Sequence, residues 1–453
     1  MRVDRSQRTS AATGGPTADE RRASPPGPGD RPSALPRANL GGPTTEEAEA
    51  AAPRTPGGCA DTACSRRRLV SIAGVGALAG LVGGCARPGQ SSAGARLTVH
   101  KARLYWGGQP FTALGANVWQ LQDYFYSGAR SFTIGGTTWN GSYPGGASHG
   151  ARVLQEASAY GLHVIRFIAG GWNPAWVHVW QTNASAWWRA HDAMMAAAAK
   201  ARVYLIPSLL FHPGAYAVAT GESHASVFQR GTRANQLAMG FVRQYVSRYK
   251  SHPNILLWEL GNEWNLGTAR GPVAKQYFHN LAQLQQAMAD VTAAIRDVDP
   301  HHLVGSGNAS PPYGNGPAEG WTLSEQRRAF IAVNQHVDVA CLHVYANAGL
   351  LAPTRVAAYL RTMAAAARSD LGKPLMVGEF GENYVTHRQA TFVHNILGSW
   401  SSGTFPLALV WSWMAAPTTS ASQRASSVDP TLRPRVAALF RSYASRHPWP
   451  PRG

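Results

Sequence analysis

The stretch "NILLWELGNE", residues 254–263, is a short apolar run that ends in polar residues and carries two glutamates, Glu259 and Glu263. Short apolar runs bounded by turn-forming residues are typical of buried strands. Further runs of this kind are "PFTALGANVW" (110–119), "GLHVIRFIA" (161–169), "RVYLIPSLLF" (202–211), "HLVGSGN" (302–308), "VDVACLHVYA" (337–346), "PLMVGEF" (374–380) and "PLALVWSW" (406–413). Together these runs predict eight strands.

Helical patterns separate the runs. Apolar residues recur at three- and four-residue spacing in "ASAWWRAHDAMMAAAAKA" (184–201) and in "ANQLAMGFVRQYVSRYKS" (234–251). Strands that alternate with helices predict parallel βα units. We therefore predict an α/β fold, a single (β/α)8 TIM barrel with extended βα loops over residues 96–445. An open doubly wound sheet is the competing architecture, but no Gly-rich phosphate turn follows the first run.

Polar and aromatic residues gather at the ends of the predicted strands. Active sites in this architecture lie at the carboxyl ends of the strands, where a purely structural barrel would need turn formers. The residues at these ends are Asn117, Trp119, Arg166, His212, Asn262, Glu263, His343, Tyr345, Glu379, Trp411 and Trp413. We therefore expect the functional site at this end of the barrel.

Two glutamates in this set can act as a pair. Cleavage of a glycosidic bond with retention needs one carboxyl to protonate the leaving oxygen and another, about 5 to 5.5 Å away, to attack the anomeric carbon. Glu263 and Glu379 end the fourth and seventh runs, so they can face each other across the barrel mouth. We expect Glu259, deeper in the barrel, to form a buried ion pair, and Glu382, in the following loop, to be a solvated charge.

The order of these motifs resembles a known family. "WELGNEW" (258–264) is followed by "HVY" (343–345) and by "KPLMVGEFGE" (373–382), and this order is similar to that in retaining glycoside hydrolases with a barrel fold. "YKSHPNILLWELGNE" (249–263) and "IRDVDPHHLVGSG" (295–307) are similar as well. From about residue 114 to 413 the chain resembles glycoside hydrolase family 5, the cellulase and mannanase family.

The resemblance implies roles for the matching residues. Glu263 would be the general acid/base and Glu379 the nucleophile of a double displacement on a β-linked mannan or glucan. Asn262 would bond the sugar 2-hydroxyl, and Arg166 would keep the nucleophile ionised because a neighbouring cation lowers a carboxylate pKa. Glu263 must stay protonated near neutrality, which burial against an aromatic ring such as Trp258 or Trp264 would favour.

The other matching residues would bind and orient the substrate. His343 and Tyr345 would orient the two carboxylates, and Trp411 would form the platform under the sugar. His212, Asn117 and Trp119 complete the predicted substrate-binding set. One position departs from the family pattern, because Trp264 stands where Pro often follows the acid/base glutamate, and this leaves the adjoining subsite open.

Neither a metal nor a cofactor is predicted, because the chain has no HExxH motif and no Cys/His cluster. His301 and His302 are expected at the surface. Of the tryptophans near the predicted strand ends, we expect about half to be core residues and the rest to stack on sugars. These are Trp119, Trp139, Trp172, Trp176, Trp264 and Trp321. The long loop "YFYSGARSFTIGGTTWNGSYPGGASHG" (124–150) is expected to wall the cleft or close one end.

The formal net charge is +18, and the residues after Cys85 contribute +15 of it, with 31 basic against 16 acidic residues. The 37 arginines and 5 lysines are scattered, and no nucleic-acid module is recognisable. We therefore predict no nucleic-acid partner. The resemblance implies a carbohydrate partner, and we also expect a monomer. A polyanion-binding protein remains an alternative, and salt-dependent binding without glycan hydrolysis would support it.

The N-terminal part has a different composition from the rest. Residues 1–64 are rich in Pro, Gly, Ala and Arg and contain almost no large apolar side chains, so we expect disorder. "SRRRLVSIAGVGALAGLVGGC" (65–85) resembles a twin-arginine export signal that ends in a lipobox, with residues 86–95 as a linker. Cys85 would carry the lipid and tether the protein to the outer face of a membrane. An uncleaved anchor or a cytoplasmic helix is the alternative.

Two alternatives to the enzyme described above stay open. One is an exo-acting β-glycosidase or transglycosylase, in which the long loop blocks one end of the cleft. The other is a non-catalytic, carbohydrate-binding surface lipoprotein with a decayed site. Both glutamates, Asn262, Arg166 and Tyr345 are present in the sequence, which argues against decay.

Overall fold

The computed structural model describes residues 96–447 apart from 129–130, 135–136, 141–145, 172, 269–276, 312–320, 347–350, 385, 387–388, 414–424 and 429. The predicted prefix, signal segment and linker, and with them Cys85, lie outside the described residues. Within this part of the chain, no helix combines the length and apolar character that crossing a membrane requires.

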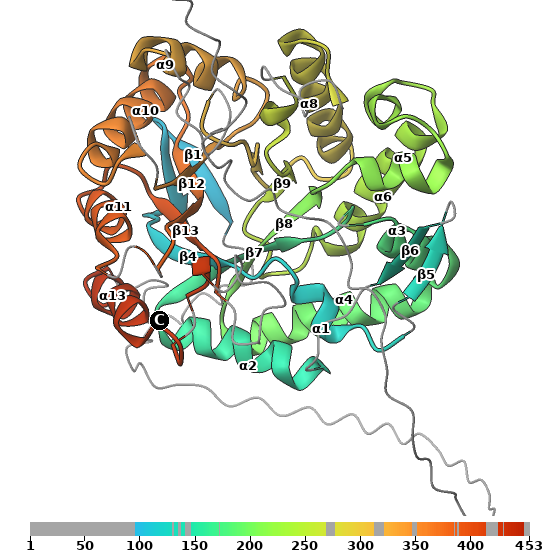
Figure 1. Ribbon diagram of the computed structural model, residues 1–453, viewed down its shortest axis with the longest axis horizontal. Helices are drawn as coiled ribbons and strands as arrows, with labels where there is room; N and C mark the ends of the chain where they lie inside the picture. Colours follow the sequence, from blue (N-terminus) through green and yellow to red (C-terminus); the bar gives the residue numbers. More distant parts are fainter. Residues whose placement is uncertain are drawn as a thin grey trace, which may run out of the picture. The chain divides into compact units, whose positions relative to one another are not determined.

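Eight parallel strands form a closed barrel at the centre of the fold (Figure 1). In chain order they are β4 (Ala113–Asn117), β7 (Leu162–Ile168), β8 (Tyr204–Leu210), β9 (Trp258–Gly261), β10 (Val304–Gly305), β11 (Ala340–Tyr345), β12 (Leu375–Gly381) and β13 (Leu407–Trp411). Neighbouring strands pair in parallel, and a bridge between Gly305 and Val339 closes the ring between β10 and β11. Each strand coincides with one of the eight predicted runs, with β12 extending one residue beyond its run, so the predicted (β/α)8 architecture is confirmed.

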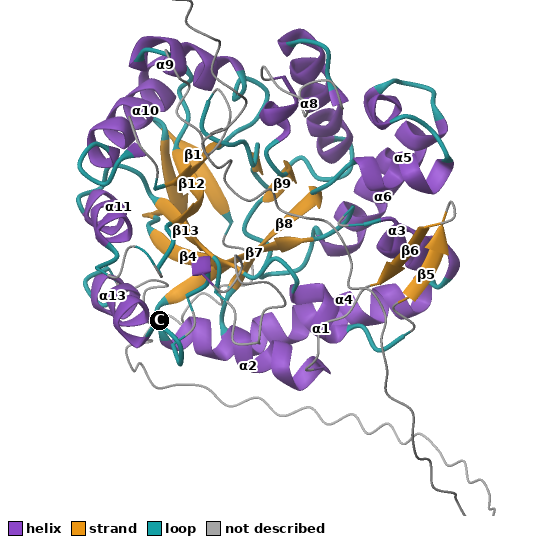
Figure 2. Ribbon diagram, viewed as in Figure 1, coloured by secondary structure: helices purple, strands orange, loops and turns teal. Residues whose placement is uncertain are grey.

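Helices surround the strands on the outside of the barrel (Figure 2). They are α1 (Leu121–Phe125), α2 (Gly146–Ala159), α3 (Pro174–Thr182), α4 (Ala184–Ala201), α5 (Gly214–Thr220), α6 (Arg233–Tyr249), α8 (Leu281–Arg296), α9 (Leu323–Ala332), α10 (Val356–Asp370), α11 (Thr391–Ser401) and α13 (Pro434–Ala444), with short 3-10 helices η1 (His224–Phe228) and η2 (Trp264–Thr268). The two strongest helical patterns of the sequence correspond to α4 and α6. Both begin where a side-chain oxygen, of Asn183 and Thr232 respectively, accepts a backbone N–H of the first turn.

An antiparallel sheet that the sequence analysis missed precedes the barrel. It consists of β1 (Leu97–His100), β2 (Arg103–Trp106) and β3 (Gln109–Pro110). Leu97 and Leu104 are buried in one cluster with residues from the amino-terminal halves of the barrel strands, among them Val164 and Leu407. The sheet therefore covers the end of the barrel opposite to the carboxyl ends of the strands.

The long loop after β4 contains defined elements. Helix α1 is followed by an antiparallel hairpin of β5 (Ser131–Ile134) and β6 (Thr137–Asn140). The hairpin lies against α3, where the rings of Phe132 and His178 are 5.0 Å apart. The expectation that this loop walls or closes a cleft stays a prediction.

The prediction that Glu382 is a solvated loop charge was wrong. Its side chain is buried, and Oε1 accepts the backbone N–H of Val393 at 3.2 Å in the first turn of α11. A carboxylate is favoured there because the first N–H groups of a helix have no partners within the helix.

The prediction that His302 is a surface residue was also wrong, whereas His301 is exposed as expected. His302 Nδ1 lies 2.6 Å from Asp299 Oδ2, which also accepts the indole N–H of Trp258 at 2.9 Å. Buried polar groups need such partners, so this cluster fixes the connection that leads from α8 to β10.

The position of Leu104 in the sheet that closes the barrel predicts a large loss of stability on truncation. Leu104 is 2% exposed, and we expect Leu104→Ala to lower the free energy of unfolding by about 2 to 4 kcal/mol. Urea denaturation measures this quantity. The matched control is Leu281→Ala, because Leu281 is 39% exposed and should change it by about 0.5 kcal/mol or less. Equal effects of the two substitutions would contradict the packing described here.

Candidate active site

A buried arginine lies at the centre of the polar residues at the carboxyl end of the barrel. Arg166, on β7, is 1% exposed. Its Nε donates to both carboxylate oxygens of Glu259 at 2.7 and 2.9 Å, and Nη1 donates to Glu379 Oε1 at 2.6 Å. Nη1 also donates to Asn117 Oδ1 at 2.9 Å, and Nη2 donates to Asn262 Oδ1 at 2.8 Å. One guanidinium therefore fixes four side chains from three other strands and the turn after β9.

The ion pair predicted for Glu259 is thus present, and its partner is Arg166. Burial alone would lower the pKa of this arginine, but the charges of Glu259 and Glu379 raise it. Both oxygens of Glu259 bond the guanidinium, so Arg166 and Glu259 form a buried ion pair below the site.

Glu379 is 4% exposed and lies on β12 next to two donors. Arg166 contacts Oε1, as predicted, and the Tyr345 hydroxyl donates to Oε2. The pKa of Glu379 is raised, contrary to the expectation: burial and the charge of Glu263 raise it, while His343, Arg166 and the Tyr345 bond lower it. The donors therefore offset only part of the cost of burying this carboxylate.

Glu263 has a different environment at the end of β9. Burial raises its pKa to about 7, and among the neighbouring charges Arg166 opposes this shift. A carboxyl that is protonated near neutrality can donate a proton, which is what the acid in acid/base catalysis requires. This agrees with the expectation that Glu263 stays protonated near neutrality.

His343 lies between the two glutamates. Its Nδ1 is 3.0 Å from Glu263 Oε1 and 3.5 Å from Glu379 Oε1. Burial lowers the pKa of His343 to about 4, so the ring is neutral near pH 7. A proton on Nδ1 can then bond a carboxylate oxygen without adding a charge to the site.

The same three residues bring a ring nitrogen and two carboxylate oxygens within 4.8 Å of one another. Such a group could in principle hold a metal ion. However, Arg166 and Tyr345 already donate to the two oxygens of Glu379, and the arginine adds a positive charge that would repel a cation. The donor set fits a carboxylate pair better than a metal centre, and the absence of a catalytic metal stays a prediction.

Asn117 was predicted to contact substrate, and its burial contradicts this. The side chain is 0% exposed, and Nδ2 donates to the backbone carbonyls of Gly378 at 2.9 Å and Val410 at 3.3 Å. Its Oδ1 accepts from Arg166. Asn117 therefore orients the arginine from below. Asn262, which is half-buried, is held by the same guanidinium beside Glu263.

The two tryptophans of the predicted substrate set stack on each other. The rings of Trp119 and Trp411 are 6.4 Å apart and inclined by 12°. Trp119 is only 4% exposed and packs with Ile168 and Phe211, so it supports the half-buried Trp411 and is not itself an open platform.

His212 directly follows β8 and is half-buried. Its ring lies 5.0 Å from that of Phe211, and its predicted role in substrate binding stays a prediction.

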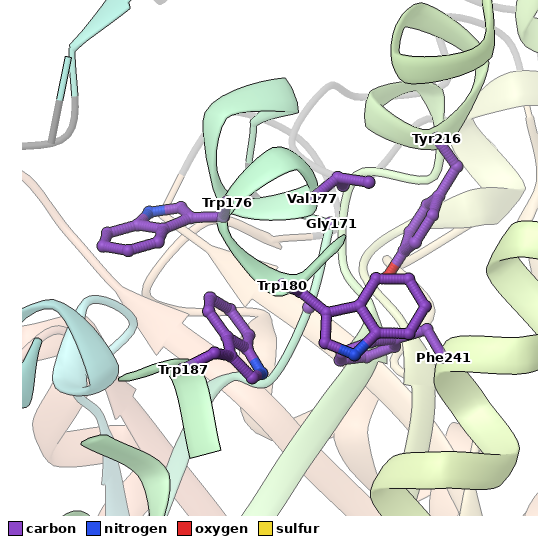
Figure 3. A pocket seen from close by; sticks show the side chains of 8 residues that line it. Gly171, Trp176, Val177, Trp180, Trp187, Tyr216 and Phe241 are labelled. Atoms are coloured by element: carbon purple, nitrogen blue, oxygen red, sulfur yellow. The ribbon is translucent and has the colours of Figure 1, made fainter. Parts of the chain in front are cut away.

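Other tryptophans expected near the strand ends are core residues. Trp176 lies in an aromatic cluster between α3, α4 and α6 that is packed too closely to admit a water molecule (Figure 3). Trp180 meets Phe241 edge to face at 5.2 Å in this cluster. Trp264 is also buried, and Trp321 is half-buried. Trp172 and the side chain of Trp139 lie outside the described residues.

Gly307 is a site residue that the sequence analysis missed. Its φ is +68°, and a Cβ there would lie 1.9 Å from the carbonyl oxygen of Gly261 and 2.8 Å from the carboxyl carbon of Glu259. Its own carbonyl accepts the N–H of Glu263 at 2.8 Å. Only glycine allows the loop after β10 to come this close to the glutamates. The run "HLVGSGN" showed a glycine at a strand end, but not this close approach.

Comparison with known proteins agrees with this geometry. The family model described as Cellulase (glycosyl hydrolase family 5) matches residues 128–413. No curated protein sequence matches the chain.

Solved structures share the fold at low sequence identity. The endo-1,4-β-mannanase of Rhizomucor miehei superposes with a TM-score of 0.59 at 16% identity, covering 78% of this chain and 99% of the mannanase. A glycoside hydrolase family 5 mannosidase from the same organism gives 0.56 at 13% identity, covering 79% and 98%. The exo-β-1,4-mannosidase of an Opitutaceae bacterium gives 0.55 at 16% identity, covering 76% and 61%.

The raised pKa of Glu263 predicts a pH-dependent cost in stability. The carboxyl ionises near pH 4.5 in the unfolded chain and at about 7 in the folded protein, so folding stability falls as the pH rises between these values. Glu263→Gln cannot ionise. The measured quantity is the free energy of unfolding of Glu263→Gln minus that of the wild type. We expect this difference to be about 2 to 3 kcal/mol larger at pH 8 than at pH 4.5.

Urea denaturation at the two pH values tests this, with Glu325→Gln as the control. The capping bond from Thr322 lowers the pKa of Glu325, so that carboxylate stabilises the fold above its unfolded pKa, and its substitution should destabilise the protein at pH 8. A Glu263→Gln advantage that is independent of pH would show that Glu263 has an ordinary pKa.

Proposed function

The chain belongs to glycosyl hydrolase family 5, and from this premise we propose that it hydrolyses β-linked glycans by double displacement with retention. The observation that supports the mechanism is the pair Glu263 and Glu379. Carboxylate oxygens of the two lie within 4.8 Å of each other. Retaining glycosidases hold their carboxyl groups about 5 to 5.5 Å apart, whereas inverting enzymes leave about 6.5 to 9.5 Å for a water molecule.

In the first step Glu379 attacks the anomeric carbon while Glu263 protonates the leaving oxygen. Arg166 and Tyr345 hold the attacking carboxylate, and their bonds fix its position before the substrate arrives. A glycosyl ester on Glu379 results. In the second step Glu263, now ionised, takes a proton from water, the water oxygen bonds to the anomeric carbon, and Glu379 leaves as a carboxylate.

The pH dependence of activity follows from the two environments. Glu263 must be protonated for the first step, so kcat/KM is expected to fall as the pH rises above about 7. At low pH the activity falls again, since protonation of Glu379 removes the nucleophile.

A β-1,4-mannan is the first substrate to test and a β-1,4-glucan the second. Mannan comes first because the solved proteins of similar fold include enzymes named as mannanases and mannosidases, while the family model is named for cellulase. These neighbours include an endo-acting and an exo-acting enzyme. An exo-acting glycosidase or a transglycosylase is therefore the second candidate. Product analysis on a labelled oligosaccharide separates them, because an exo enzyme releases only terminal units.

Removing the nucleophile tests the proposal. β-Mannan, β-1,4-glucan, xylan and β-1,3-glucan are incubated with wild type, Glu379→Gln and the control Glu382→Gln. We expect the wild type to cleave at least one polymer and to release the β-anomer first, as followed by proton NMR. Glu379→Gln should lose at least about a thousandfold in kcat. Glu382→Gln should keep its kcat, because Glu382 accepts a bond from α11 and is outside the proposed machinery.

Three results would overturn this reading. Release of the α-anomer first would replace retention by inversion. Activity that survives in Glu379→Gln would remove this residue as the nucleophile. Carbohydrate binding by a wild type that cleaves none of the polymers would favour the non-catalytic lipoprotein.

For the cellular location, we propose twin-arginine export followed by lipid attachment at Cys85, supported by the pattern of residues 65–85. In a bacterial host, the wild type should fractionate with membranes and accept a labelled fatty acid. Cys85→Ala should lose the label, and Arg66→Lys with Arg67→Lys should remain inside the cell. Unlabelled wild type in the cytoplasm would contradict the proposal.

A further inference from the structure

Trp264 directly follows the acid/base candidate Glu263, at the position where the family often has Pro. The indole is 3% exposed. A ring that stacks on a sugar must expose a face, so this tryptophan is not a platform for substrate. Its function has to be sought in the residues that it contacts.

The indole of Trp264 is fixed against the end of the neighbouring strand. Its Nε1 donates to the carbonyl oxygen of Leu210, the last residue of β8, at 3.1 Å. It passes so close to Gly261 that a Cβ there would lie 2.3 Å from Nε1. The ring of Phe228, in η1, meets it edge to face at 4.8 Å. The indole thus ties the end of β9 to β8 and to the loop that carries η1.

The backbone of Glu263 needs such support. Its φ is +52°, in the left-handed region. For a residue other than glycine this conformation costs about 1 to 2 kcal/mol, and it persists only where the surroundings enforce it. The backbone of Glu263 is bonded on two sides: its N–H donates to the carbonyl of Gly307 at 2.8 Å, and its carbonyl accepts the N–H of Leu266 at 3.0 Å.

The indole is one side-chain component of this support, beside the amide of Asn265, which donates to the carbonyl of Ala309 and accepts its N–H. The two backbone bonds hold Glu263 toward β10 and along η2, whereas the Trp264 bond holds the turn toward β8. The direction of the Glu263 side chain follows from its backbone angles, and the Oε1 atom lies 3.0 Å from Nδ1 of His343. A turn released on the β8 side would relax toward an ordinary φ and carry the carboxyl away from His343. Proline has no side chain that could make the bond to Leu210.

We propose that Trp264 is a positioning residue, whose indole holds the left-handed turn that aims the carboxyl of Glu263 at the leaving oxygen. This inference rests on the proposed function, because it assigns Glu263 as the general acid. It explains the departure from Pro at position 264: this chain fixes its acid/base glutamate through a buried indole bonded to β8.

The test compares two leaving groups in the same variant. Trp264→Phe keeps an aromatic ring beside Phe228 but removes the N–H that bonds Leu210. The substrates are a β-linked oligosaccharide of the polymer that the wild type cleaves and the 2,4-dinitrophenyl β-glycoside of the same sugar. The sugar oxygen must be protonated as it leaves, whereas dinitrophenolate leaves without a proton.

A displaced acid should therefore affect only one substrate. We expect kcat/KM of Trp264→Phe on the oligosaccharide to fall about 10- to 100-fold, and kcat/KM on the dinitrophenyl glycoside to change by less than about threefold. The ratio of the two constants does not depend on the fraction of folded protein. Sodium azide should raise kcat on the dinitrophenyl glycoside, because azide attacks the glycosyl ester without a general base and yields the β-glycosyl azide.

The matched control is Trp400→Phe. The Trp400 indole is 1% exposed and donates to the carbonyl of Pro406 at 3.3 Å, so the substitution removes a bond of the same kind, from a buried indole to a backbone carbonyl, away from the site. It should lower stability and leave the ratio of the two constants unchanged. An unchanged ratio of the two constants in Trp264→Phe, whether both fall equally or neither falls, would overturn the positioning role. A wild type that cleaves neither substrate would instead refute the proposed function.

Discussion

The fold of the site depends on the buried guanidinium of Arg166. An unpaired charge at 1% exposure would cost several kcal/mol, and here the cost is offset by bonds to two carboxylates and two amides. These partners come from β4, the strand and turn of β9, and β12, so the arginine requires the barrel to close in one register. The register places Asn117 opposite both Arg166 and Trp411, and His343 opposite Glu379.

This constraint also separates the two glutamates. Glu379 shares its oxygens with Arg166 and Tyr345, and its charge is stabilised where it would be needed for attack. Glu263 lies in the turn beyond β9, where burial dominates and raises its pKa to about 7. Neutral His343 reaches both without adding a charge. One cation placed nearer to one carboxylate than to the other therefore gives two residues of the same type the different environments that the proposed nucleophile and acid need.

Much of this arrangement could be predicted from sequence because strand ends can be read from apolar runs. The positions of Glu263 and Glu379 follow from the runs that they terminate, and Glu259 follows from its place four residues earlier in the strand.

Depth and burial could not be read in the same way. Asn117 and Trp119 end a strand like the others, yet the first lies below the arginine and the second behind Trp411. The burial of Glu382 and His302 depends on α11 and on Asp299, which only the folded chain brings to them. The sheet of β1, β2 and β3 was missed because its short strands are stabilised by contacts with the barrel and not by a local pattern.

The central claim is that Glu379 forms a covalent bond to the sugar while Glu263 serves as acid and base. A 2-deoxy-2-fluoro β-glycosyl fluoride of the cleaved sugar tests it most directly, because the fluorine at C2 slows both steps and the fluoride leaving group restores the first. Mass spectrometry of the inactivated protein should show one added fluorosugar, and peptide mapping should place it on Glu379. A label on Glu382 or Glu263, or continued turnover without any label, would contradict the account.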